Sequence, residues 1–250
     1  MNYLSVGTNN LSTDLFLDIK NTENIKPIGG LWATIQKMEF IHYNEWVDHL
    51  CSNPYILFFH KFDNPYRIPA VYITLKNSAN IFILDSDEKI KFLKEKYPFN
   101  DWIDFEKLSR DYDGIFIDLT NINKGKHQKK DAIIKNFSVN TLILFNLSCI
   151  DFYKQAEVDL TNTTLGNPYE FPEYTIKINS QKLKIEQAKN EIQLLIEKIK
   201  RYMLDNNIKP SLENYEIIKK VFQEAINKAL ISENSSQKEA LLIRKVFNQF

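Results

Sequence analysis

The sequence predicts a mixed α+β domain followed by a helical region, and three observations support this prediction. Short apolar runs rich in β-branched and aromatic residues recur through the first 150 residues, as in buried strands. Polar residues that favour helix N-caps precede amphipathic segments between these runs. After residue 178 the apolar residues recur at three- and four-residue steps, the period of a helix. We therefore expect an α+β domain over 1–155, a connector over 156–178 and a helical subdomain over 179–250.

The expected strands of the α+β domain are all short. They cover residues 3–6, 31–34, 55–60, 70–75, 81–84, 114–119 and 141–146. The adjacent pair Gly29 and Gly30 after Pro27 predicts a turn into the second strand. In the connector, two X-Pro pairs disfavour helix, and the alternation over 174–178 predicts a returning edge strand.

Helices are expected at 43–50, 86–97 and 105–112 in the first domain. Ser86 is a good N-cap for the second of these, because acidic residues follow it and lysines gather near the other end. The apolar stripes of the last region predict three more helices, over 180–206, 211–231 and 236–250.

Charge and composition exclude several classes of protein. The chain has 32 Lys and Arg against 32 Asp and Glu, so it lacks the basic excess of a protein that binds phosphate backbone or anionic lipid over a wide surface. The charge is divided, however: residues 179–250 hold 13 basic and 9 acidic residues, so that the helices are basic and the rest is acidic. These helices are expected to bind a partner or the acidic domain beside them. No apolar stretch approaches the length of a membrane span, and no signal peptide is evident, which favours the cytoplasm or delivery into a target cell's cytosol.

Metal and nucleophile motifs are weak in this sequence. Cys51 and Cys149 are expected to be reduced, buried thiols. His42 and His49 do not have the spacing of metal ligands with Cys51, so we expect no metal. Phosphate-binding glycine loops are absent. A basic loop over 124–130 is either solvated or faces a substrate or partner.

Residues 26–34 (Lys-Pro-Ile-Gly-Gly-Leu-Trp-Ala-Thr) form the most site-like segment. The Gly pair allows close approach of the backbone. Strand alternation places Trp32 and Thr34 on one side, so they suit a pocket for a flat ring with a polar group. A tight turn with Trp32 in the core explains the same pattern equally well.

The chain resembles a family of mono-ADP-ribosyltransferase-like proteins of phages and bacterial effectors. The resemblance covers residues 3 to about 150 and rests first on 3–8 (Tyr-Leu-Ser-Val-Gly-Thr) and on 26–34. Further matches follow in order at 44–46, 83–87, 104–108, 111–115 and 142–146, of which the last two are weak singly and support the resemblance by their order.

This resemblance implies a split β-sheet fold with an NAD-binding cleft between two small sheets. NAD is then a substrate, whose ADP-ribose passes to a protein or a nucleic acid. The implied cleft residues are Ser5, Gly7, Thr8, Gly30, Trp32 and Thr34. A carboxylate from a late strand would stabilise the positive charge that develops on the ribose as nicotinamide leaves.

Two departures from the family pattern affect this function. The family tends to have His-Tyr-Gly where this chain has Ser5, Val6 and Gly7. Asn140 stands where the catalytic Glu is expected, and an amide cannot supply the same negative charge. Another acid (Glu106, Asp113 or Asp118) replaces it, or the alignment shifts by a few residues, or the transferase chemistry is lost. The sequence therefore leaves an ADP-ribosyltransferase and a catalytically degenerate binding protein of the same fold as alternatives, beside an unrelated α+β protein.

Overall fold

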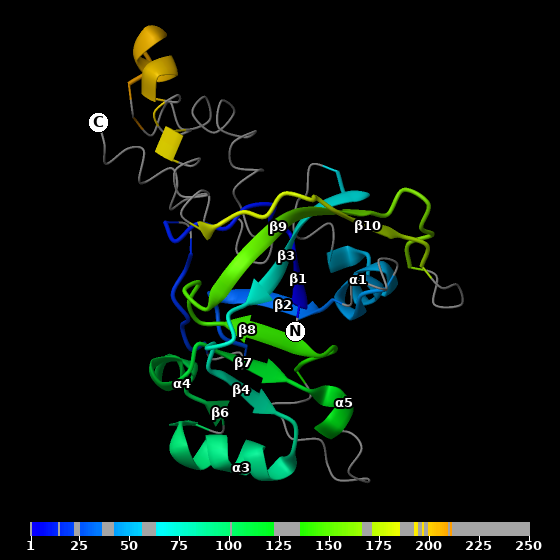
Figure 1. Cartoon of the computed structure of the whole chain (residues 1–250), viewed down its shortest axis with the longest axis vertical. Helices are drawn as coiled ribbons and strands as arrows, with labels where there is room; N and C mark the ends of the chain where they lie inside the picture. The colour runs from blue at the N-terminus through cyan, green and yellow to red at the C-terminus, as the bar shows by residue number, and fades with distance from the viewer. Residues whose placement is uncertain are drawn as a thin grey trace.

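The computed structural model describes most of the first 185 residues and little beyond them. The described residues are 2–14, 16–22, 26–36, 43–56, 64–100, 102–122, 136–166, 172–185, 193, 194, 197, 200–209 and 211. They form one large mixed sheet with short helices, so the predicted α+β class is confirmed (Figure 1).

The strands and helices follow one another in this order: β1 Asn2–Val6, β2 Leu31–Ile35, α1 Glu45–Ser52, β3 Arg67–Leu75, β4 Ile81–Leu84, α3 Asp87–Lys96, β5 Pro98–Phe99, β6 Trp102–Ile103, α4 Phe105–Asp111, β7 Gly114–Ile117, α5 Leu119–Ile122, β8 Thr141–Leu144, β9 Ile150–Asp159 and β10 Thr175–Ile178.

The eight-stranded sheet has the order β10-β9-β3-β1-β2-β8-β7-β4, and only β4 and β7 are parallel. The pairing between β1 and β2 is the shortest in this sheet. Only two residue pairs, Tyr3 with Ile35 and Leu4 with Thr34, join these strands. The other part of β2 pairs with β8 instead. The sheet therefore consists of two halves, β10-β9-β3-β1 and β2-β8-β7-β4, that separate where β1 and β2 diverge.

Three apolar clusters hold this arrangement together. One packs α3 and α4 against β4, β7 and β8, and a second packs α1 against β1, β3, β9 and β10. The third lies between the halves and joins Val71 and Ile73 of β3 to Leu142 and Leu144 of β8. Burial of these side chains, about 1.5–3 kcal/mol for each large one, is the main force that fixes the two halves together.

Local capping explains the two longer helices. The Asn44 side chain accepts hydrogen bonds from the backbone N–H groups of Trp46 and Val47 at the start of α1. Ser86 accepts from Lys89 N at the start of α3, as the sequence predicts. Each cap satisfies backbone donors that have no partner within the helix.

Two expectations from the sequence are wrong in this region. The expected strand at 55–60 begins instead with helical residues, Tyr55 and Ile56, because Pro54 suits the first turn of a helix and Ile56 N donates to Asn53 O. The rest of that segment lies outside the described residues.

The second correction concerns the expected domain boundary at residue 155. β9 crosses this position and pairs with β3 over nine residues of that strand, so residues 156–159, the start of the expected connector, belong to the sheet. The expected edge strand is present as β10, which pairs with the end of β9.

The C-terminal region is described only in part. Residues 200–205 are helical, within the first of the three expected helices. The helices expected at 211–231 and 236–250 and the basic loop at 124–130 lie outside the described residues. Among the residues that the structure describes, no helix is long and apolar enough to cross a membrane.

Candidate functional site

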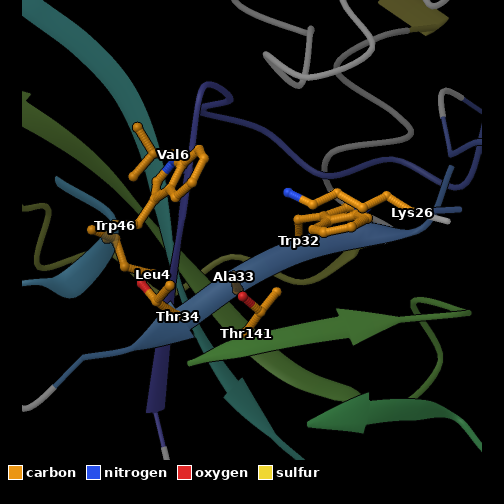
Figure 2. Close-up of a pocket in the computed structure, with 8 residues that line it drawn as sticks. All are labelled: Leu4, Val6, Lys26, Trp32, Ala33, Thr34, Trp46 and Thr141. Atoms are coloured by element: carbon orange, nitrogen blue, oxygen red, sulfur yellow. The ribbon is translucent and has the colours of Figure 1, made fainter. Parts of the chain in front are cut away.

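A small pocket with a cavity volume of about 30 Å³ lies beside β1 and β2 (Figure 2). A cavity of this size has room for a water molecule, so a larger ligand must widen it. Its lining comes from β1, β2, α1, β8 and the turn before β2: Leu4, Val6, Lys26, Trp32, Ala33, Thr34, Trp46 and Thr141. Most of this lining is apolar, with two hydroxyl groups and one cation added. Segments far apart in the sequence thus meet at one cavity.

Trp32 is held in place by the turn that precedes it. Its Nε1 donates to Gly29 O at 3.0 Å, and its ring stacks on Phe137 with centroids 6.0 Å apart. Gly29 and Gly30 have φ of 79° and 68°, in the left-handed region that favours glycine. A Cβ on Gly30 would lie only 2.8 Å from Leu144 O. The glycine pair is therefore required for β2 to approach β8 and to present Trp32 at the pocket.

Thr34 connects β2 to the start of α1. Its Oγ1 donates to the Asn44 side-chain oxygen at 3.0 Å, the same oxygen that caps α1. The pairing of β2 with β8 ends at Ala33 and Leu142, next to Thr34 and Thr141, and both threonine side chains line the pocket. One hydrogen-bonded unit therefore fixes the pocket floor and the helix that carries Trp46.

Asn140 is bonded to a carboxylate that the sequence pattern did not single out. Its backbone N donates to Glu45 Oε2 and its Nδ2 donates to Glu45 Oε1, both at 2.9 Å. Its amide also exchanges hydrogen bonds with Thr120, at 2.9 Å and 3.2 Å. Glu45 begins α1, between Asn44 and the pocket residue Trp46. Asn140, at the position where the family resemblance implies a Glu, therefore binds the carboxylate of Glu45 from elsewhere in the chain.

Nothing local in the sequence could have revealed this pair, because its members are 95 positions apart. Residues 44–46 are one of the further matches to the family, but the match gives Glu45 no role. The three acids considered as substitutes lie elsewhere, and each accepts a hydrogen bond from a backbone N–H. These are Glu106 with Asn21, Asp113 with Asn80 and Asp118 with Asn121. None of the three lines the pocket.

The three N-terminal candidates do not line the pocket. Leu4 and Val6 do, so alternation along β1 turns Ser5 to the opposite face, where its hydroxyl is buried without a hydrogen-bond partner among the described residues. Thr8 Oγ1 donates to the backbone oxygen of Asn10 at 2.7 Å. Gly7 has φ of 107° and bends the chain after β1. Of the implied cleft residues, Trp32 and Thr34 therefore line the pocket, and Gly30 lies in the turn before Trp32. Ser5, Gly7 and Thr8 are not in the lining.

A buried polar network joins α1 to Tyr174, the residue just before β10. The Tyr174 hydroxyl donates to Asp48 Oδ1 at 2.7 Å and accepts from Asn44 N at 2.5 Å. Burial raises the pKa of Tyr174, and burial is also the main reason that the pKa of Asp48 is raised. This network connects β10 to the helix that carries Glu45 and Trp46.

Two basic side chains contact tryptophans of the pocket lining. Lys26 Nζ lies 5.8 Å from the Trp32 ring centroid, and His49 stacks on Trp46 at 5.4 Å. The pKa of His49 is lowered, first by burial and then by the charge of Lys26.

The structure supports the expectations about thiols. Cys51 and Cys149 are free and buried, and burial raises the pKa of each to about 12. Within the described ranges, no group of three or more His, Cys, Asp and Glu side chains could hold a metal ion. Comparison with protein-family models, curated proteins and solved structures found no match to this chain.

Proposed function

We propose that the chain is a mono-ADP-ribosyltransferase-like protein of toxin, phage or effector type that uses NAD as its substrate. The observation that carries this proposal is that Trp32 and Thr34 line one pocket, and that the Glu45–Asn140 pair lies next in sequence to two further lining residues, Trp46 and Thr141. The resemblance at 26–34 points to this segment, and the geometry gives it a cavity.

The side chains of this lining match the chemistry of NAD, and the cavity of about 30 Å³ must open for NAD to enter. The indole rings of Trp32 and Trp46 offer apolar faces to a flat heterocycle, and Thr34 and Thr141 offer hydroxyl groups to its polar substituents. The glycosidic bond to nicotinamide breaks with both electrons leaving on the nicotinamide nitrogen. An acceptor nucleophile then attacks the ribose carbon and loses its proton.

Glu45 is the carboxylate we assign to the charge that develops on the ribose. Both of its oxygens accept hydrogen bonds from Asn140, so the anion is held in one orientation before the reaction begins. A fixed charge of this kind stabilises a transition state without reorganisation, and its loss commonly costs two to three orders of magnitude in rate.

The test is nicotinamide release and transfer of labelled ADP-ribose to candidate protein and nucleic-acid acceptors. The Glu45→Gln variant should lower kcat by about 100-fold and leave NAD binding within a factor of about three. Glu95→Gln, on the exposed face of α3, is the matched control and should keep full activity. No nicotinamide release and no label transfer from the wild-type chain at high protein concentration would exclude the transferase.

A second candidate function is a binding protein on the same fold with no catalysis. It is favoured by one observation: among the described residues that line the pocket there is no carboxylate. NAD would then raise the melting temperature by mass action without being consumed. A partner captured by the full chain and lost after removal of 186–250 would assign recognition to the C-terminal region.

A further inference from the structure

β4 is an outer strand of the large sheet. Among the described strands it pairs only with β7, and Figure 1 shows it at the border of the sheet beside α3. Asp118 N donates to Leu84 O on the inner edge of β4. Because the backbone groups of successive residues point to opposite edges of a strand, those of Ile81 and Ile83 point outward, away from β7. The outer edge of β4 therefore has the backbone geometry to receive a further strand.

This edge lacks the residues that commonly protect an outer strand. Such strands often carry a lysine or a proline that hinders pairing with another chain. β10, at the opposite border of the sheet, has the exposed Lys177. β4 has the sequence Ile-Phe-Ile-Leu, and the side chain of Ile83 is 49% exposed. An exposed apolar edge of this kind favours pairing with another strand.

Helix α3 extends the apolar edge. The chain turns back after Leu84 through a short connection, and Phe92 in the middle of α3 stacks on Phe82 of β4 with centroids 5.9 Å apart. α3 therefore runs along β4 in the opposite direction. Phe92 is 42% exposed, although other residues of α3 pack in the core. The edge thus has an apolar centre made by the strand and the helix together.

Oppositely charged residues flank Phe92 on the same side of α3. Glu88 lies four residues before Phe92 and Lys96 four residues after it, so the three side chains form one stripe along the helix. Glu88 and Lys96 are exposed. Lys96 Nζ lies 5.7 Å from the Phe92 centroid, and it also bonds to Asp111 of its own chain. The order acid, aromatic, base is complementary to itself when a second copy runs in the opposite direction.

We propose that two copies of this chain pair through β4 and α3 around a two-fold axis. With Phe82 opposite its own copy, Ile81 of each strand pairs with the partner's Ile83, so that the outward backbone groups bond and apolar side chains meet on both faces. The same axis brings the two Phe92 rings together and places each Glu88 beside the partner's Lys96. This self-complementarity favours a second copy over an unrelated strand.

The dimer is expected to be weak. A four-residue strand and one side of a helix form a contact below the standard size of about 800 Å² per partner, which corresponds to a Kd on the order of 10 µM. The contact is also separate from the pocket, because β7 lies between β4 and β8, the strand that carries Thr141. The inference therefore holds whether or not the chain cleaves NAD.

Sedimentation velocity of the full chain over about 1–500 µM tests the dimer. The wild type should change from monomer to dimer across this range. Ile83→Lys places a charge at the apolar edge and should weaken the dimer by at least about 30-fold. Tyr66→Lys is the matched control, since Tyr66 is 45% exposed beside β3 in the other half of the sheet and should leave the dimer unchanged.

A charge exchange tests the pairing of the two helices. Glu88→Lys leaves two basic ends on the stripe and Lys96→Glu leaves two acidic ends, so each variant alone should dimerise about 10-fold more weakly than the wild type. An equal mixture of the two variants should form a heterodimer with an affinity near that of the wild type, because opposite charges meet again at both ends. This recovery would also show that both variants are folded.

Cysteine variants test the register of the two strands. Phe82→Cys should form a disulfide between copies under mild oxidation, because directly opposite Cα atoms at such a pair lie about 4.5 Å apart. Ile83→Cys is the control: its position is more exposed, but in this register it lies diagonally from its own copy and should cross-link less. The inference would be overturned by a wild type that stays monomeric at about 500 µM, by a dimer that Ile83→Lys does not weaken, by a mixture without a heterodimer, or by faster cross-linking of Ile83→Cys.

Discussion

The hydrogen bonds between Asn140 and Glu45 predict a pH-dependent loss of stability in Asn140→Asp. Aspartate has the shape of asparagine, and it can still accept from Thr120 N and bond to the Thr120 hydroxyl. The change therefore isolates the contact with Glu45, where an N–H donor at 2.9 Å becomes a second carboxylate oxygen.

The size of the effect follows from this distance. Two unit charges 2.9 Å apart repel by about 1.4 kcal/mol in water and by about 6 kcal/mol at an effective dielectric constant of 20. Asn140 is buried and Glu45 is half-buried, so an intermediate value applies. One of the two carboxylates can also bind a proton, which removes the repulsion. Protonation near pH 7.5 costs about 5 kcal/mol, so the loss of unfolding free energy cannot exceed about this value. We expect the variant to lose about 2–4 kcal/mol of unfolding free energy at neutral pH.

The two facing carboxylates of the variant determine whether its unfolding free energy rises or falls with pH. Because the folded variant binds a proton more readily than the unfolded chain, its stability is greatest at low pH and falls as pH rises through the raised pKa of the pair. Urea unfolding at about pH 4.5 and about pH 7.5 measures this loss. The double variant Glu45→Gln with Asn140→Asp should recover at least about 1 kcal/mol at neutral pH, because an amide again faces a carboxylate. Equal losses at both pH values, or no recovery in the double variant, would refute this account of the pair.

Three further predictions concern stability and reactivity. Gly30→Ala should lower the unfolding free energy by more than about 2 kcal/mol, because φ is positive and the added Cβ meets a backbone oxygen of β8, and a normal thermal midpoint would contradict the turn described here. Because the pKa of Asp48 is raised in the folded chain, its contribution to the unfolding free energy is lost as pH rises from 3.8 through the pKa of the folded state. The Asp48→Asn side chain can still accept from Tyr174, so this variant should show a flatter pH profile in urea unfolding. Cys51 and Cys149 should react slowly with a thiol reagent at neutral pH and quickly after denaturation, whereas rapid reaction of the native chain would show that one of them is accessible.

Much of the sheet could be predicted because its strands carry their signal locally. β2, β4, β7 and β8 are short apolar runs, and their ends are marked by turn residues or helix caps. α1 and α3 begin at side chains that accept hydrogen bonds from the first turn. In these elements the burial pattern and the local propensity agree.

β9 could not be predicted, because its pattern is irregular. Its buried residues do not alternate strictly: Ile150 and Tyr153 are three apart, and the register with β3 shifts between Thr74 and Leu75. Charged residues occupy several of the remaining positions. The tertiary pairing with β3 overrides this weak signal.

The candidate site was predictable only where its residues are neighbours in sequence. The turn at Gly29 and Gly30 fixes Trp32 and Thr34 on one strand, so their common side follows from alternation alone. The contact between Glu45 and Asn140 depends on how α1 lies against β8. Ser5 is misplaced for a related reason, since the pocket lies on the face of β1 that Leu4 and Val6 occupy.

Strand β2 has consequences for how this protein can change in evolution. Leu31 packs into the core between the two halves of the sheet, whereas Trp32 and Thr34 turn their side chains to the pocket and Ala33 contacts both. Substitutions at Leu31 therefore act on folding, and those at Thr34 act mainly on ligand choice. Because the two kinds of position lie along one strand, ligand specificity can diverge between relatives while the packing beneath it stays the same.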